Sequence, residues 1–261
     1  MRVCIFASGS GGNCLLVSDG NTNILIDAGI SARRVENALA MAGLAADDIG
    51  GVFVTHEHSD HVKGLPQLVK KHGTPIFVPR TVAARMLGAM PALEESVSII
   101  PVGESFPFGN IVISAFHTMH DTDESVGYVI EGDGSFGIAT DTGCINEEIT
   151  SALAGVGTVV IESNHDVQML RDGPYPVYLK KRILSDNGHL SNDDCARFAR
   201  RLAESGTRQI ILGHLSRENN RPAIALETVG AALEGLPVSL YSAPELGFLE
   251  LEVRSGAVCS V

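Results

Sequence analysis

Short apolar runs separated by glycine-containing turns dominate the chain, and they predict its strands. Each run is three or four residues long and is rich in valine, isoleucine, leucine and phenylalanine, which is typical of buried β-strands. The predicted strands cover residues 3–6, 14–17, 24–26, 52–54, 76–78, 98–100, 111–114, 127–130, 136–139, 159–161, 210–212 and 238–241.

Helices are predicted between groups of these strands. Ser31 is a typical N-cap, and Gly43 a typical end, for a helix that reaches about residue 41. Pro66 suits the first turn of a helix that continues to residue 72. Further helices are expected after Ser191, which precedes two aspartates, and after Pro222.

The order of these elements predicts the fold class. Two groups of strands, with helices able to cover each outward face, favour an α+β fold of two packed sheets inside helical layers. No linker or repeat divides the 261 residues, and 44% of them are hydrophobic, so we expect one folded domain over residues 1–261. No apolar run of about 18 residues predicts a membrane span. Serine and glycine at residues 8–12 interrupt the apolar start too early for a secretory signal peptide.

The five cysteines indicate a reducing compartment. Their number is odd and no two form a C-x-x-C pair, which argues against a disulfide framework and against a thiolate zinc site. We therefore expect a cytoplasmic protein whose cysteines are small core residues. They are Cys4, Cys14, Cys144, Cys195 and Cys259.

The strongest chemical signal is a run of histidines directly after the strand predicted at 52–54. It reads His56-Glu57-His58-Ser59-Asp60-His61. Imidazole and carboxylate are ligands for zinc, manganese or iron, and three imidazoles with one carboxylate within six residues are too many for one ion. A lone histidine is more often structural, but the cluster reverses that expectation. His56 and His58 are expected to face one ion, and Asp60 and His61 a second.

Further candidates also come just after predicted strands. They are His117 and His120, then Asp141, then His214. A carboxylate can bridge two cations, so Asp141 is expected to be shared between them, with a turn-forming aspartate as the alternative. Asp27 ends another strand and is expected to fix the histidine loop by hydrogen bonds rather than to bind metal.

The order of these residues resembles the metallo-β-lactamase-fold hydrolases. The pattern His56-x-His58-x-Asp60-His61, followed by His120, Asp141 and His214, lies in a match that covers most of the chain. Longer motifs narrow the resemblance to the YycJ (WalJ/VicX) group, which is similar to ribonuclease Z and whose members are regarded as metal-dependent exonucleases acting on DNA. These motifs lie at residues 8–13, 162–166, 173–176 and 188–192.

The resemblance implies a four-layer αββα sandwich with two divalent metal ions, zinc or manganese, at one edge between the sheets. It favours His120 over His117, because the pair His120-Asp121 matches the pattern of the group. It assigns one ion to His56, His58 and His120, and the other to Asp60, His61 and His214, with Asp141 shared.

Other polar residues are candidates for catalysis or substrate contact. His189, in Gly-His-Leu-Ser, resembles the histidine of ribonuclease Z that is thought to assist the leaving group; a polar residue before a helix N-cap is the alternative. For His165 and the adjacent Asn164, contact with substrate phosphate and orientation of a metal ligand both stay open. The glycine-rich loop with Ser10 and Asn13 either presents N–H groups to a phosphate or is a tight turn. The candidate catalytic residues are Asp60 and His189.

These residues predict metal-assisted hydrolysis. A dinuclear centre lowers the pKa of water toward neutrality. Asp60 can accept a proton, and a protonated His189 can supply one to the leaving oxygen. We expect a phosphodiester hydrolase, with a DNA exonuclease of the 5′→3′ type favoured over an enzyme acting on RNA. A thioester or lactone hydrolase on the same fold, and a metal-binding regulatory protein without turnover, are the alternatives.

The net charge of −12 at first argues against a nucleic-acid partner, because phosphate neutralisation dominates affinity for nucleic acid. The basic residues are concentrated, however. Residues 171–221 carry ten basic and six acidic side chains, a charge of +4 against −16 for the remainder. This segment includes His189 and His214, so the charge does not exclude a nucleic-acid substrate there. The 5% of aromatic residues favour contact with the phosphate backbone over base stacking.

Overall fold

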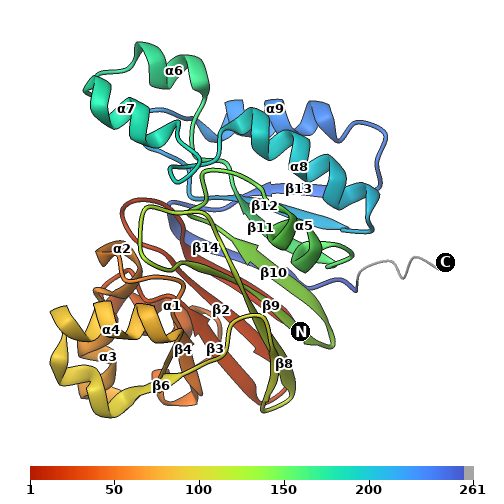
Figure 1. Cartoon of the computed structure of the whole chain (residues 1–261). Helices are drawn as coiled ribbons and strands as arrows, with labels where there is room; N and C mark the ends of the chain where they lie inside the picture. The colour runs from red at the N-terminus through yellow and green to blue at the C-terminus, as the bar shows by residue number, and fades with distance from the viewer. Residues whose placement is uncertain (256–261) are drawn as a thin grey trace.

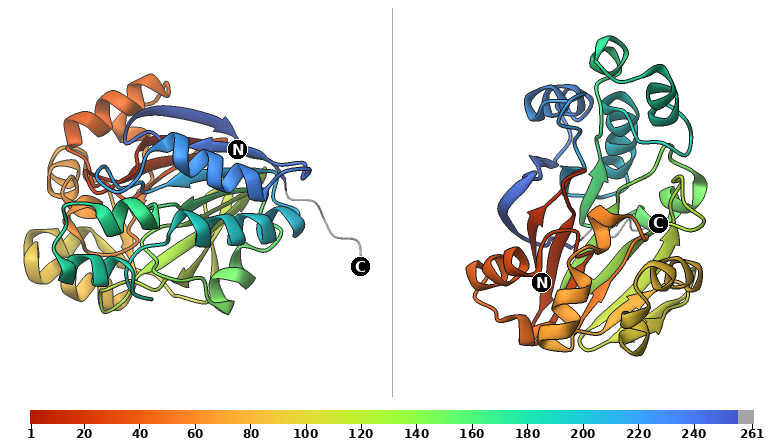
Figure 2. Two further views of the ribbon diagram at one scale, coloured as in Figure 1. Left: turned by 90° about the horizontal axis from the view of Figure 1, so that it is seen from above. Right: turned by 90° about the vertical axis from the view of Figure 1, so that its left-hand side faces the viewer.

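Two seven-stranded β-sheets lie face to face, and helices cover their outer faces (Figure 1). The computed structural model describes residues 1–255. The strand order is β14-β1-β2-β3-β4-β5-β6 in the first sheet and β13-β12-β11-β10-β9-β8-β7 in the second. Figure 2 shows the layers from two further sides. The predicted αββα sandwich is therefore confirmed.

The elements follow one another with short connections. The strands are β1 Arg2–Ala7, β2 Cys14–Asp19, β3 Thr22–Ile26, β4 Gly51–Phe53, β5 Ile76–Val78, β6 Val97–Ile99, β7 Ser105–Phe108, β8 Ile111–His117, β9 Val126–Gly132, β10 Gly134–Ala139, β11 Thr158–Glu162, β12 Gln209–Gly213, β13 Ser239–Ser242 and β14 Leu246–Glu252. The helices are α1 Ala32–Met41, α2 Ser59–Val62, α3 Leu65–His72, α4 Arg80–Ala89, α5 Glu147–Leu153, α6 Val167–Asp172, α7 Val177–Ile183, α8 Asn192–Glu204 and α9 Pro222–Ala232, with 3-10 turns at Ala46–Asp48 and Pro91–Ser96.

The strands are uniformly apolar because both of their faces are buried. In β1, Val3 and Ile5 enter the core between the two sheets, whereas Cys4 and Phe6 pack under the helices of the first sheet. A sheet covered on both faces needs no polar alternation. The core between the sheets contains residues from both of them, which supports the expected single domain, although the domain count stays a prediction.

All twelve predicted strands and all four predicted helices are present, with ends shifted by a few residues. The Ser191 hydroxyl accepts a hydrogen bond from the backbone N–H of Asp194, as expected of an N-cap. The structure also contains elements that the sequence pattern does not predict: β7, β14 and helices α2 and α4–α7. The two missed strands lie at sheet edges and are half-exposed; a half-exposed strand has no continuous apolar run to reveal it.

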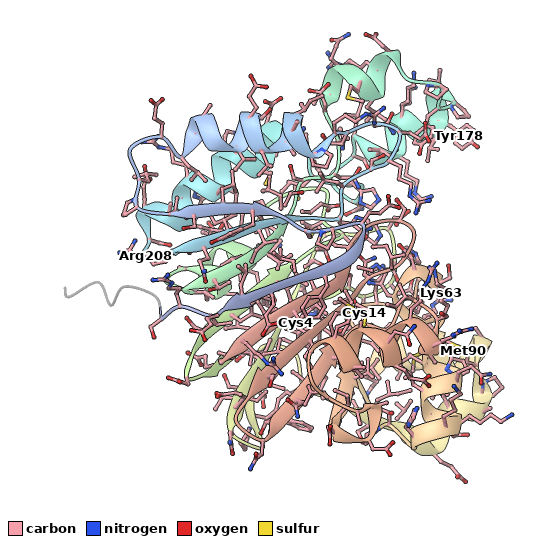
Figure 3. The ribbon with its side chains drawn as sticks, turned by 180° about the vertical axis from the view of Figure 1, so that it is seen from behind. Cys4, Cys14, Lys63, Met90, Tyr178 and Arg208 are labelled. Carbon is pink, nitrogen blue, oxygen red and sulfur yellow. The ribbon has the colours of Figure 1, made fainter. Side chains whose placement is uncertain are left out.

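Three of the four cysteines that the structure describes are small core residues, as expected. Cys4, Cys14 and Cys195 are buried, and Cys144 is partly exposed. Figure 3 shows Cys4 and Cys14 within the first sheet. Burial raises the pKa of all three buried thiols. Cys259 lies outside the described residues. Within residues 1–255, no helix is long and apolar enough to cross a bilayer.

Candidate metal centre

One edge of the sandwich collects the ends of six strands from both sheets. Strands β3 and β4 are parallel, as are β10, β11 and β12, so their carboxyl ends meet at the same edge. The polar residues that end or follow these strands are Asp27 after β3, the run 56–61 after β4, His120 after β8, Asp141 after β10, Glu162 at the end of β11 and His214 after β12.

Three residues of this edge have left-handed backbones. Asp27, Asp141 and His214 have φ angles of 57°, 55° and 53°, and within the described chain they are the non-glycine residues with positive φ. This conformation is uncommon outside glycine, and such strain concentrates at functional sites. Each of the three follows a strand within two residues, so the chain turns sharply where it leaves the sheet.

His56, His58 and His120 form the first group of candidate ligands. Each offers one ring nitrogen, and these nitrogens lie within 4.8 Å of one another. The Nε2 atom of His56 is 3.1 Å from the Nδ1 atom of His58. Burial lowers the pKa of both His56 and His120, so these imidazoles are neutral near pH 7 and have a free lone pair to offer a cation.

Asp60, His61 and His214 form the second group, again with ligand atoms within 4.8 Å. The Oδ2 atom of Asp60 is 3.7 Å from His61 Nε2 and 3.8 Å from His214 Nε2. Burial disfavours a charged imidazole, but the carboxylates of Asp27 and Asp141 raise the pKa of His61 to about 9. The negative charge of these carboxylates therefore favours a cation at this group.

Asp141 lies between the two groups. Its Oδ1 atom is 3.4 Å from His214 Nε2 and 3.8 Å from His120 Nε2, and its Oδ2 atom is 3.4 Å from His61 Nε2. The side chain is 3% exposed. One carboxylate thus faces histidines of both groups, which is the geometry that a bridging ligand needs.

Asp27 and Thr55 orient the histidine loop. Asp27 Oδ1 accepts a hydrogen bond from the Thr55 backbone N–H at 2.9 Å, and Oδ2 accepts one from His61 Nδ1 at 2.7 Å. A carboxylate only accepts, so His61 carries its proton on Nδ1 and presents Nε2 to the centre. The predicted role of Asp27 in fixing the loop by hydrogen bonds is confirmed.

Glu162, which was not predicted as a functional residue, orients two further histidines. Its Oε1 atom accepts hydrogen bonds from His189 Nδ1 at 2.7 Å and from His214 Nδ1 at 2.9 Å. Its Oε2 atom accepts one from the Thr142 backbone N–H at 2.9 Å. Burial opposes ionisation, but the two histidines keep the pKa of this carboxyl low. The signal available in the sequence was a glutamate that ends an otherwise apolar strand, Thr-Val-Val-Ile-Glu.

The donor set fits a pair of divalent cations. The Oδ2 atom of Asp141 and the Nε2 atom of His214 are buried and have no hydrogen-bond partner. Buried polar atoms normally find partners, and a cation would provide one for both. Five imidazoles and two carboxylates, without sulfur, suit zinc or manganese.

Comparison with known proteins shows the family of the chain. Residues 22–215 match the beta-lactamase superfamily domain. The chain belongs to the β-lactamase superfamily. The exodeoxyribonuclease YycJ of Bacillus anthracis is 37% identical over 90% of this chain and 89% of its own length. The exodeoxyribonuclease WalJ of Streptococcus pneumoniae serotype 2 (strain D39 / NCTC 7466) is 36% identical over 87% and 86%. Both matches place the chain in the YycJ group of the superfamily.

A solved structure has the same fold. The metallo-β-lactamase fold protein YhfI from Bacillus subtilis superposes with a TM-score of 0.70 at 15% identity, covering 96% of this chain and 99% of its own. At this identity the likeness concerns the fold alone. It supports the arrangement of sheets and helices described above for this member of the superfamily.

The glycine-rich loop forms a tight turn beside the second group. The Gly12 backbone N–H donates to the Gly9 carbonyl at 2.9 Å, and Asn13 Oδ1 accepts from the Gly9 N–H at 2.9 Å. The Asn13 side chain is buried, with Nδ2 2.9 Å from His61 Nε2, whereas Ser10 is exposed. The geometry accounts for the glycines by the turn. Substrate contact by Ser10 or Asn13 stays a prediction.

The remaining candidates lie outside the two groups of candidate ligands. Asn164 Nδ2 donates to the His214 carbonyl at 2.9 Å and so supports that residue. His165 is 1% exposed, both of its ring nitrogens lack a partner, and burial lowers its pKa to about 4. His117 lies outside both groups; its half-exposed ring is 3.0 Å from Glu148. Substrate contact by Asn164 or His165 stays a prediction.

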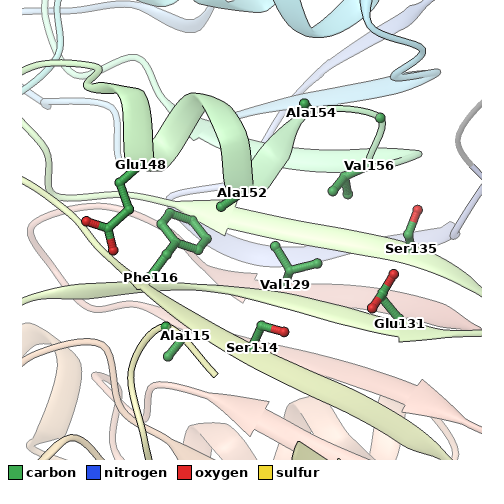
Figure 4. Close-up of a pocket in the computed structure, with 12 residues that line it drawn as sticks. Ser114, Ala115, Phe116, Val129, Glu131, Ser135, Glu148, Ala152, Ala154 and Val156 are labelled. Atoms are coloured by element: carbon green, nitrogen blue, oxygen red, sulfur yellow. The ribbon is translucent and has the colours of Figure 1, made fainter. Parts of the chain in front are cut away.

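A separate cavity lies on the outer face of the second sheet, beside α5. It has a volume of about 400 Å³, and its walls include Ser114, Phe116, Val129, Glu131 and Glu148 (Figure 4). None of its lining residues belongs to the two groups of candidate ligands. The cavity is therefore separate from the candidate metal centre at the sheet edge.

The absence of a side chain at Gly29 lets the backbone of Asp60 pack closely against it, and we expect Gly29→Ala to disturb this packing. A Cβ atom at this position would lie 1.5 Å from the Asp60 carbonyl oxygen, so the loop has to move. Overpacking of this kind costs about 1–3 kcal/mol of unfolding free energy. Urea unfolding measures the loss, and the content of bound metal should fall with it.

Gly88→Ala is the matched control for this substitution. Gly88 lies in α4 with no atom within 4 Å of an added Cβ, and alanine is favoured over glycine in a helix by about 0.5–1 kcal/mol. We therefore expect unchanged or higher stability. If Gly29→Ala also unfolds at or above the native urea midpoint, the close contact between Gly29 and Asp60 does not constrain the loop.

Proposed function

We propose that this protein is a metal-dependent exonuclease that hydrolyses DNA phosphodiesters, of the 5′→3′ type. The observation that carries the proposal is the convergence of two groups of donor side chains on the shared carboxylate of Asp141. Two relatives at 36–37% identity are named exodeoxyribonucleases, which supports DNA rather than RNA as the substrate.

The proposed ligands divide into an imidazole-only site and a mixed site. His56, His58 and His120 would hold one cation, and Asp60, His61 and His214 the other, with Asp141 shared. Three imidazoles favour zinc at the first site, while the oxygen ligands of the second site also suit manganese. When bound, two such cations supply Lewis acidity toward a phosphodiester and lower the pKa of a coordinated water.

Asp60 is the proposed proton acceptor for the attacking water. Burial alone would raise its pKa, but the nearby imidazoles of His214 and His61 lower that pKa below the ordinary range. The carboxylate is therefore ionised at neutral pH. Its side chain is 24% exposed, compared with 3% for Asp141, so Asp60 lies on the side of the centre that water can reach.

His189 is the proposed proton donor for the leaving oxygen. Its ring centroid lies 5.1 Å from that of His120 and 5.3 Å from that of His214, so it borders both groups. Its Nδ1–H bonds Glu162, which leaves Nε2 for the substrate. Burial opposes protonation, but the Glu162 carboxylate raises the pKa of His189 above its ordinary value, so the imidazolium is available near neutral pH.

Metal content and a substrate panel test the proposal. We expect the purified native protein to contain close to two divalent ions per chain by mass spectrometry. It should release nucleotides stepwise from the 5′ end of 5′-phosphorylated DNA, faster than from RNA. Chelation should stop cleavage, and re-addition of Mn²⁺ or Zn²⁺ should restore it.

The same panel separates the alternatives. Bis(p-nitrophenyl) phosphate reports phosphodiester hydrolysis without a nucleic acid, and a thioester and a lactone report attack on a carbonyl. Turnover of the thioester or lactone without cleavage of any phosphodiester would replace the nuclease proposal with a carbonyl hydrolase. Two bound metals without turnover of any of these substrates would favour a regulatory protein.

A further inference from the structure

The segment that contains α6 and α7 projects from the sandwich beside the candidate metal centre. In Figure 1 it lies at the upper left, above the edge that carries α2, and in the right-hand view of Figure 2 it extends beyond the other helices. Figure 3 shows Tyr178 of α7 and Lys63, next to α2, at the same edge of the molecule. The role proposed above for the metal centre does not use this segment.

The outer face of α7 is apolar where a surface helix is normally polar. Val177 is 69% exposed, Tyr178 75% and Leu184, just after the helix, 45%. These are three of the seven large hydrophobic side chains that are exposed in the described chain. Ile183, in contrast, is buried. Exposed apolar side chains gathered in one place indicate an interaction surface.

The same face is positively charged in an acidic protein. Residues 171–184 contain four basic side chains and one acidic side chain, whereas the whole chain has a net charge of −12. Lys181 and Arg182 follow Tyr178 by three and four residues, the spacing that places helix side chains on one face. Among the described residues, Lys181 has no ion-pair partner. The charge of this face complements a polyanion.

Contacts at the end of α7 connect this face to the metal centre. Arg182 forms an ion pair with Asp121, the residue after His120. The His189 backbone N–H donates to the Ile183 carbonyl at 3.0 Å. A ligand lying along α7 therefore continues directly toward His120 and His189.

We propose that the outer face of α7 binds single-stranded DNA next to the nucleotide that is hydrolysed. Tyr178 stacks on an unpaired base, and Lys181 and Arg182 contact the adjacent phosphates. A single strand is specified because stacking needs the free face of a base, which a duplex covers with the neighbouring base pair. The proposal rests on the proposed function. It also modifies the expectation drawn from the few aromatics, because two of the four tyrosines, Tyr175 and Tyr178, lie in this segment.

Substrate length and base content test the proposal in the metal-loaded enzyme. For 5′-phosphorylated single-stranded DNA of about 20 nucleotides, Tyr178→Ala should raise KM by about 5- to 150-fold, the range for loss of one stacked base, with kcat unchanged. KM for bis(p-nitrophenyl) phosphate should not change. On an oligonucleotide whose flanking nucleotides are abasic, native enzyme and Tyr178→Ala should have equal KM, and Tyr178→Phe should retain native KM on normal DNA.

Charge reversal tests the phosphate contact with a matched control. Lys181→Glu should weaken binding of single-stranded DNA and make the slope of log K against log salt shallower by at least about 0.7, the value for one phosphate contact on a single strand. Lys70→Glu changes the charge equally in the last turn of another helix, α3, and should leave binding unchanged. Met41→Ala, an exposed apolar residue (66%) on α1, is the control for Tyr178→Ala.

Binding of DNA measured without turnover distinguishes failure of the proposed α7 surface from failure of the proposed nuclease function. Fluorescence anisotropy of labelled single-stranded DNA in Ca²⁺ reports α7 even if no phosphodiester is cleaved. Weaker binding by Tyr178→Ala and Lys181→Glu supports the surface in either case. Native binding by both variants overturns it. The proposal is also overturned if Tyr178→Ala weakens binding of fully paired DNA as much as binding of single-stranded DNA, because a stacked base is then not what Tyr178 recognises.

Discussion

Asp141→Asn is expected to lower metal-dependent DNA cleavage by at least about 10³-fold, because both groups of candidate ligands lose their shared carboxylate. Asparagine is the informative replacement. Asp141 has a φ of 55°, which asparagine tolerates far better than alanine. A loss of activity in this variant therefore reports the missing charge rather than backbone strain. Asp141 lies 3.8 Å from His120 of the first group and 3.4 Å from His214 of the second, so both sites should weaken together.

Metal content checks this prediction independently of activity. We expect fewer than two ions per chain in Asp141→Asn by mass spectrometry, with an unchanged circular dichroism spectrum. Asp47→Asn, at a side chain that is 79% exposed, is the control and should retain native metal content and activity. Two tightly bound ions and native turnover in Asp141→Asn would exclude Asp141 as the bridge.

His189→Ala is expected to lower kcat on DNA by about 10²- to 10⁴-fold, the usual contribution of a positioned acid. The variant should keep both metal ions, because His189 is not one of the proposed ligands. The leaving group supplies the decisive comparison. A deoxyribose oxygen needs a proton as it departs, whereas p-nitrophenolate leaves as a stable anion. Hydrolysis of bis(p-nitrophenyl) phosphate should therefore change little.

The pH profile gives a second measure of the same residue. A general acid acts in its protonated form, so kcat on DNA should fall as pH rises through the pKa of His189, which Glu162 raises above the ordinary value. His189→Ala should lack this alkaline fall. Glu162→Gln should move it to lower pH, since a neutral amide stabilises the imidazolium less than a carboxylate. His117→Ala, at an exposed ring, should behave as the native enzyme. If His189→Ala lowers kcat equally on DNA and on bis(p-nitrophenyl) phosphate, His189 positions the substrate or the metal instead.

Several parts of the centre were predictable because they are local in the chain. His56 and His58 lie in the loop after β4, and Asp60 and His61 lie in the short helix α2 that follows it, so the residue types and their spacing already indicate two ions. The structure also brings His120, Asp141 and His214 to that loop, as the resemblance implied, although their role as ligands stays a prediction. His117, which spacing alone left open, lies outside the groups and beside Glu148.

Other parts depend on contacts that no local pattern contains. Glu162 joins His189 and His214, which are 27 and 52 residues away in the chain, because parallel strands β11 and β12 end beside each other. The exposed face of α7 was also not predicted, since its apolar side chains resemble a buried stripe until the fold shows that Tyr178 is 75% exposed among the described residues.

The sequence by itself determined the apolar strands, the sandwich and the residue types of the centre, because hydrophobic periodicity and motif spacing are local properties. Only the tertiary structure decided which atoms meet. The register of two sheets and the left-handed turns at Asp27, Asp141 and His214 place the donor atoms of each group within 4.8 Å of one another. This placement results from many packing contacts between segments that are far apart in the chain, so no single segment encodes it.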